Sequence, residues 1–186
     1  MPSERVASRS AALTSCGLVL ASVALLGQIS REEALDTAYP GASAEAETLF
    51  LTEPQVAEVA ALADVDLPSP MVGRFVIRRD GHVVGRAYVD THVVRTKRES
   101  LLIALDASGR VQRIDVTAFL EPAEYRAPAP WLDQFRDGAL SDDLELQRRI
   151  RPIAGASLTA RAVTDAVRRV LAIDRVLASA AQEEPR

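Results

Sequence analysis

The sequence predicts an α+β fold, in which an antiparallel β-sheet carries C-terminal helices on one face. Alternating apolar and polar residues begin after Met71, with Phe75 and Ile77 on one side of a strand. The period changes to that of a helix after Ser157, where apolar residues recur on one face. The chain has 186 residues, of which 48% are hydrophobic, enough for one well-packed domain with extensions.

The first segment is predicted to target the chain or to anchor it. Residues 11–27, AALTSCGLVLASVALLG, carry no charge, and Arg5 and Arg9 precede them. As a helix this run would span roughly 25 Å, close to the thickness of a bilayer core. We therefore expect residues 1–28 to be a signal peptide or membrane anchor, with the rest of the chain on the extracytoplasmic (periplasmic) side. The alternative is a buried helix of the domain.

Residues 29–69 read as a helical extension that ends in a stiff linker. Ser30 and Glu33 have the spacing of a capping box, which predicts a helix over 30–38. Thr52 and Gln55 repeat that spacing at the start of a second helix, with Pro54 in its tolerant first turn. The linker is Leu-Pro-Ser-Pro at 67–70.

Residues 70–175 are predicted to form the main domain. Asp80-Gly81 is a two-residue hairpin signal that joins the strand around Phe75 to a returning strand over 82–89. A second pair, over 101–105 and 111–119, is joined by the turn at 106–109. Two hairpins imply an antiparallel sheet, one face of which the later helices should cover.

Three helices are expected after the strands. Pro130 opens a short one that runs through Phe135, and Ser141 caps another. The last helix turns an apolar stripe to the core, so Arg161, Arg168 and Arg169 should be solvated. Residues 176–186 are its end and a polar tail.

Composition excludes several functions. The net charge of −4 argues against nucleic acid as a partner, because phosphate binding needs a surplus of cations. With one cysteine and two histidines the chain has too few ligands for a cysteine-based or multi-histidine metal site. It contains neither a Gly-x-Ser-x-Gly elbow nor a P-loop.

The turn before the last helix carries the chemistry. Small residues at Gly155, Ala156 and Ser157 would leave backbone N–H groups and the positive end of a helix dipole free for a phosphate. Nearby cations could supply counter-charge, namely Arg148, Arg149 and Arg151. The plainer interpretation is an ordinary N-cap by Ser157 or Thr159.

The run Ile-Ala-Gly-Ala-Ser-Leu-Thr at 153–159 resembles the signature of the FMN-binding domain family, which includes the flavin-bearing small subunits of the Rnf complex and of the sodium-translocating NADH:quinone reductase. In that family FMN is joined by a phosphoester to a threonine of an Asp-x-x-Ser/Thr-Gly-Ala-Thr run. The resemblance implies that Ser157 is the acceptor, with Gly155, Ala156, Leu158 and Thr159 around the phosphate. It extends upstream over residues 72–173.

Three residues depart from that signature. Arg151 stands where the family has an acidic residue, Ala154 replaces a hydroxyl residue, and Ser157 replaces the threonine. Serine keeps a nucleophilic oxygen, so esterification stays chemically feasible. The resemblance further implies that Glu121, Tyr125 and Trp131 lie near the flavin ring, although Trp131 suits an ordinary core equally well. His92 and Arg95 are candidates for the lining of the flavin pocket, and a paired surface histidine is the alternative for His92.

The resemblance implies an electron carrier with FMN joined covalently to Ser157, rather than a self-standing enzyme. It would relay electrons between donor and acceptor proteins, and a flavin transferase would attach the cofactor. Two alternatives stay open: a flavin-dependent reductase of a small substrate, and a flavin-free extracytoplasmic interaction domain.

Overall fold

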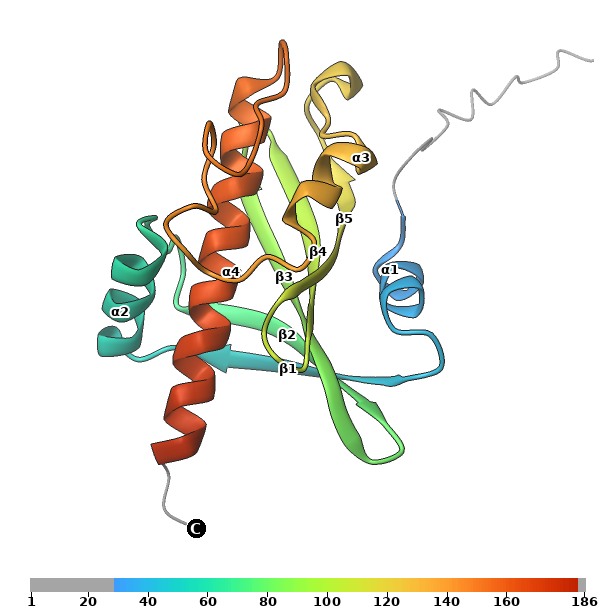
Figure 1. Ribbon diagram of the computed structural model, residues 1–186, viewed down its shortest axis with the longest axis vertical. Helices are drawn as coiled ribbons and strands as arrows, with labels where there is room; N and C mark the ends of the chain where they lie inside the picture. The colour runs from blue at the N-terminus through green and yellow to red at the C-terminus, as the bar shows by residue number, and fades with distance from the viewer. Residues whose placement is uncertain (1–28, 184–186) are drawn as a thin grey trace, which may run out of the picture.

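The computed structural model describes residues 29–183 of the chain (Figure 1). The predicted anchor or signal peptide at residues 1–28 lies outside the described residues. Within the described part, no helix combines the length and the apolarity that a membrane span requires.

Five strands form one antiparallel sheet in which each strand pairs with the next along the chain. They are β1 (Ser43–Phe50), β2 (Met71–Arg79), β3 (His82–Val93), β4 (Arg98–Asp106) and β5 (Val111–Phe119). Asp80 and Gly81 make the turn between β2 and β3, both with positive φ. The predicted antiparallel sheet and α+β class are therefore confirmed.

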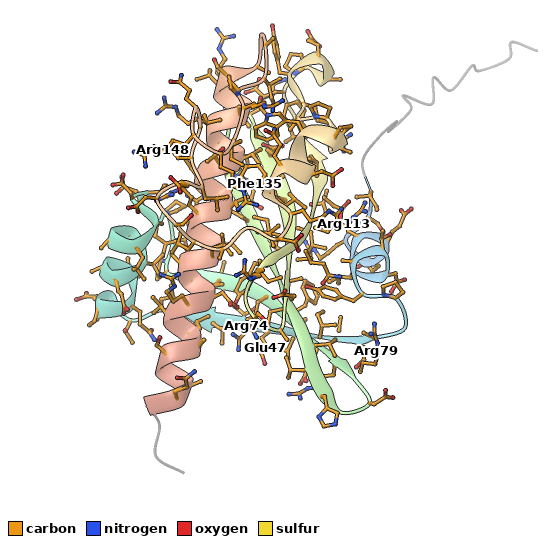
Figure 2. The ribbon with its side chains drawn as sticks, in the orientation of Figure 1. Glu47, Arg74, Arg79, Arg113, Phe135 and Arg148 are labelled. Atoms are coloured by element: carbon orange, nitrogen blue, oxygen red, sulfur yellow. The ribbon has the colours of Figure 1, made fainter. Side chains whose placement is uncertain are left out.

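Strand β1 was not expected, because residues 29–69 were predicted to be helical apart from a linker. Its residues are mostly exposed, so it lacks the apolar alternation by which strands are recognised. Its place at the edge of the sheet comes from pairing with β2. Glu47 lies opposite Arg74 in that pairing, and their side chains form an ion pair of 2.7 Å (Figure 2). Charged edge residues of this kind also discourage pairing with other chains.

The helices are α1 (Arg31–Ala38), α2 (Glu53–Ala63), α3 (Ala129–Leu132) and α4 (Ser157–Glu183), with 3₁₀ turns η1 (Ala123–Tyr125) and η2 (Asp133–Phe135). Both predicted starts in the extension are confirmed: the Ser30 side chain accepts the Glu33 N–H, and Thr52 and Gln55 form a capping box. The short helix near Pro130 is also present, as α3 followed by η2.

The helix predicted after Ser141 does not form. Residues 141–150 are a series of turns, in which Gln147 has a φ of 64°. The carbonyls of Ser141 and Leu144 accept hydrogen bonds from the Arg168 guanidinium. These carbonyls therefore bond to a buried side chain of α4 instead of to N–H groups of a local helix. The residues around Ser141 give no indication of this contact, because Arg168 is distant in sequence.

Helices cover both faces of the sheet. Helix α4 crosses one face with α2 beside it, whereas α1 lies on the other side (Figure 1). The larger core lies between the sheet and α4, and includes Leu101, Ile103, Phe135, Val163 and Val167. A smaller core joins α1 to the opposite face through Leu35 and Ile77. The C-terminal helices therefore cover one face as expected, and α1 is an additional layer on the other.

The contact between α1 and the sheet depends on Gly85. Tyr39, at the end of α1, donates its hydroxyl to the backbone carbonyls of Arg86 and Leu105 at 2.9 and 2.7 Å. Its ring lies directly over Gly85, where an added Cβ would stand 2.6 Å from Tyr39 Cε1 and 2.5 Å from the Leu105 carbonyl oxygen. The absence of a side chain at Gly85 lets Tyr39 lie flat on the sheet.

We expect Gly85→Ala to lower the free energy of unfolding by ~1–3 kcal/mol, because the new methyl group must displace a backbone carbonyl and a buried ring. Gly73→Ala is the matched control, since Gly73 lies in β2 and a Cβ there would meet nothing within 4 Å. Chemical denaturation of both variants measures the difference. Equal stability of the two would contradict this account of Gly85.

Candidate functional site

Helix α4 begins without a side-chain cap. Gly155 has a φ of +78°, a left-handed conformation that glycine adopts without strain, and it turns the chain into the helix. The Ala156 carbonyl accepts the first helical hydrogen bond, from Ala160 at 3.0 Å. The N–H groups of Ser157, Leu158 and Thr159 therefore have no acceptor within the helix. These free N–H groups form the positive end of the dipole of a 27-residue helix.

Neither predicted hydroxyl acts as the cap. Thr159 is buried and donates its hydroxyl to the Tyr125 carbonyl at 2.7 Å. Ser157 is exposed, and its hydroxyl has no hydrogen-bond partner among residues 29–183. The interpretation as an ordinary N-cap is wrong for both residues. The Ser157 hydroxyl is instead left accessible at the start of the helix.

A pocket of about 240 Å³ opens at this helix start. It brings together eight of the ten residues predicted to lie around the cofactor, from three separate parts of the chain. Its lining consists of Val94, Arg95, Glu121, Tyr125, Gly155, Ala156, Ser157, Leu158 and Thr159. The walls come from the loop after β3, the segment after β5 and the first turn of α4 (top of Figure 1).

Glu121 shapes the pocket by fixing one of its loops. One oxygen of its carboxylate accepts the backbone N–H groups of Arg95, Thr96 and Lys97 at 3.3, 2.7 and 2.8 Å. These hydrogen bonds, led by those from Thr96 and Lys97, lower the pKa of the Glu121 carboxyl. Glu121 thus serves the pocket as the anchor of the loop that presents Arg95, a role that spacing alone did not reveal.

Trp131 lies in the hydrophobic core. Its ring is buried and meets Phe135 edge-on, with 5.5 Å between ring centroids. Its indole N–H donates to the Arg151 carbonyl at 2.6 Å. Trp131 is not among the residues that line the pocket, so the structure favours the core interpretation over a ring contact.

The predicted counter-charges also lie away from the pocket. Arg148, labelled in Figure 2, pairs with Glu145 and donates to the Asp142 carbonyl. Arg149 donates to the Arg136 carbonyl. Neither they nor Arg151 line the pocket, whereas Arg95, more than 50 residues earlier in the sequence, does.

His92 lines a second pocket, of about 210 Å³, which shares Val94 and Leu158 with the first. Its two ring nitrogens lie 2.8 Å from an Asp90 carboxylate oxygen and 3.2 Å from Glu99. Its side chain is only 9% exposed, so His92 is paired as expected but is not a surface residue. Arg169 completes the cluster with two hydrogen bonds to Asp90, at 2.9 and 3.1 Å. The prediction that Arg169 is solvated is wrong.

The cluster places two basic side chains, His92 and Arg169, against two acidic ones, Asp90 and Glu99. Burial lowers the pKa of His92, but hydrogen bonds to Asp90 and Glu99 outweigh burial and raise the pKa to about 9. Burial likewise raises the pKa of Asp90, and hydrogen bonds from His92 and Arg169 outweigh it, so its pKa lies below the usual range. At neutral pH both ring N–H groups of His92 are therefore donated to carboxylates, and His92 acts as a fixed cation beside the site.

A larger cavity, of about 600 Å³, lies between β5 and α3. Four of its charged wall residues form pairs, Arg113 with Asp115 and Arg136 with Asp133, and Arg126 donates to the Val116 carbonyl. It contains none of the predicted site residues. We therefore place the candidate site at the smaller pocket, where an unpaired hydroxyl, free helix N–H groups and Arg95 converge.

Comparison of the chain with protein-family models, curated proteins and solved structures finds no match. The resemblance to FMN-binding domains accordingly stays a prediction.

We expect the stability of the protein to fall as the pH rises through about 9, because the pKa of His92 is raised from 6.5 on folding. A raised pKa adds to the free energy of unfolding, here by up to ~3 kcal/mol. This contribution is fully present below pH 6.5 and is lost as the histidine of the folded protein loses its proton. Denaturant unfolding between pH 6 and 10 measures the slope.

His92→Gln should flatten this slope, whereas His82→Gln, at an exposed position, should leave it unchanged. The assignment of the slope to His92 fails if both variants retain the dependence of the wild type.

Proposed function

We propose that the pocket at the start of α4 binds FMN, with its phosphate on the N–H groups of the first turn and joined as a phosphoester to Ser157. The observation that carries this proposal is the exposed Ser157 hydroxyl, free of partners in the described chain, at the uncapped end of α4. An anion is stabilised at such an end by both the free N–H groups and the helix dipole. Arg95 adds a cation to the same pocket.

The size of the pocket limits which part of the cofactor it encloses. Its volume of about 240 Å³ lies below the ~300–1,000 Å³ of sites that bury a whole drug-sized ligand. The phosphate and the start of the ribityl chain would fill it. The flavin ring would then lie at the mouth, where Tyr125 and Leu158 are exposed. A ring held in that way is accessible to another protein.

Attachment would proceed by transfer from FAD. The Ser157 oxygen attacks the phosphorus on the FMN side of the pyrophosphate, AMP leaves, and a base of the flavin transferase takes the hydroxyl proton. The accessible position of Ser157 suits attack in the active site of a second protein.

Bound FMN would supply one- and two-electron redox chemistry, while the chain fixes the phosphate and controls access to the ring. We propose that the domain relays electrons between donor and acceptor proteins on the extracytoplasmic side, tethered or targeted by residues 1–28. A paired His92 and an anchored Glu121 leave neither residue free as an acid or base for substrate turnover, which favours relay over a reductase.

Co-expression with a flavin transferase and export should add the mass of one FMN moiety, located on the peptide that contains Ser157. Ser157→Ala should abolish the modification because it removes the attacking oxygen. Mass spectrometry of the intact protein and of its peptides provides the measurement.

Ser157→Thr is the matched control, since it keeps a hydroxyl and should retain the modification. Thr159→Ser should also retain it, because the Thr159 hydroxyl is engaged with the Tyr125 carbonyl. A label that survives in Ser157→Ala, or that lies on Thr159, would exclude this attachment.

We expect the domain to lie outside the cytoplasm. A reporter enzyme that is active only after export, fused behind Arg186, should be active, because Arg5 and Arg9 favour a cytoplasmic start of the chain. Activity of a cytoplasm-only reporter at the same position would refute the expectation.

Deletion of residues 1–28 should leave a folded, soluble domain, because the fully buried residues of both described cores lie between positions 34 and 176. Circular dichroism and gel filtration test this expectation. Aggregation of the shortened chain would favour the alternative of a buried N-terminal helix.

A further inference from the structure

Exposed apolar side chains gather at the end of the molecule where the pocket opens. Seven large apolar residues are exposed among residues 29–183, and four of them lie here. Val93 and Leu120 are each 56% exposed, Leu158 is 51% exposed and Tyr125 is 39% exposed. Leu158 lines both small pockets, which places it beside Tyr125 in one and Val93 in the other. Leu120 follows β5 and donates its N–H to the Arg98 carbonyl, on the same side of the sheet end.

Cations surround these apolar residues. Four are exposed: Arg95, Lys97, Arg98 and Arg161. In segments 93–98, 120–126 and 155–161, Glu124 is exposed and Glu121 is half-buried, and these are the two carboxylates. The Glu121 carboxylate is occupied by the backbone of the loop at 95–97. These three segments hold five cations and two carboxylates, a net charge of +3, although the whole chain has a net charge of −4. Acidic residues border them at the second small pocket, where Asp165 lies beside Arg161 and the exposed Asp64 and Asp66 flank Val65.

We propose that this surface docks on an anionic lipid bilayer. We call it the pocket-end surface and define it by its four apolar residues and four cations, namely Val93, Leu120, Tyr125, Leu158, Arg95, Lys97, Arg98 and Arg161. The apolar side chains would enter the boundary between headgroups and acyl chains, with Tyr125 at the interface. The cations around them would bind lipid phosphates, and each strengthens docking about five-fold.

The arrangement suits a bilayer better than a protein partner. The apolar residues come from three separate segments around a pocket mouth, namely the end of β3, residues 120–125 and the first turn of α4, and they form no stripe along one element. A fluid lipid surface adapts to such a scattered set, whereas a stable protein interface needs a contiguous complementary patch. A flavin ring at the pocket mouth would cover Tyr125 and Leu158, so the inference concerns the chain without FMN and is tested on protein made without a flavin transferase.

The test uses the full-length chain with Cys16→Ser and a single cysteine introduced as Leu120→Cys, which carries a polarity-sensitive fluorophore. Leu120 lines neither small pocket, so the label leaves the site unobstructed. Phe50→Cys is the matched control: Phe50 is 73% exposed, but it lies on the edge strand β1. Vesicles of phosphatidylcholine are compared with vesicles that also contain phosphatidylglycerol.

We expect the Leu120 label to shift to the blue and to be quenched by brominated acyl chains only with phosphatidylglycerol, and the shift to vanish in high salt. The Phe50 label should not respond. The double variant Lys97→Gln and Arg98→Gln should shift the equilibrium between docked and free states roughly 25-fold toward the free state.

Three results would overturn the proposal. One is the absence of a Leu120 response with anionic vesicles. Another is an equal response of both labels, or a response independent of lipid charge, since tethering through residues 11–27 alone would explain it. The last is the same response to poly-glutamate without vesicles, which would assign the surface to an acidic macromolecule.

Discussion

Two reciprocal ion pairs between β3 and α4 fix the position of the long helix, and most of the structure depends on them. Arg169 of α4 binds Asp90 of β3 through two hydrogen bonds, and Arg86 of β3 binds Asp174 of α4 in the opposite sense. Tyr88 adds a hydrogen bond to Asp174 at 2.8 Å. Because a buried charge without a partner is very costly, a shift of α4 along the sheet would break both pairs at once. The helix therefore has one position on the sheet.

A neighbouring buried cation extends this constraint to the rest of that face. Arg168 donates to the carbonyl of Ala63 at the end of α2, at 2.7 Å, and to the carbonyls of Ser141 and Leu144. The end of a helix carries partial negative charge, so a guanidinium there is stabilised without a carboxylate. Two consecutive arginines of α4 therefore hold its neighbours in place: Arg168 binds α2 and the loop at 141–144, and Arg169 binds β3.

The candidate site follows from where this helix begins. Once α4 is fixed, its first turn lies beside the ends of β3 and β5, and short polar contacts join these parts. Thr159 donates to the Tyr125 carbonyl, and Glu121 accepts from the loop that carries Arg95. The pocket walls are thereby set before any ligand arrives, which reduces the ordering that binding would require. The apolar side chains at the mouth remain exposed to a partner.

The sequence by itself determined the features that local chemistry encodes. The N-cap at Ser30, the capping box at Thr52, the hairpin at Asp80-Gly81 and the start of α4 near Ser157 all follow from neighbouring residues, and each is present. Most of the residues expected around the pocket also meet there. Only the tertiary structure decided the strand β1, the burial of Arg168 and Arg169, the core position of Trp131 and the pairing of His92. Each of these features depends on a partner that is distant in sequence. Local periodicity cannot predict such contacts, because they form only when the chain folds.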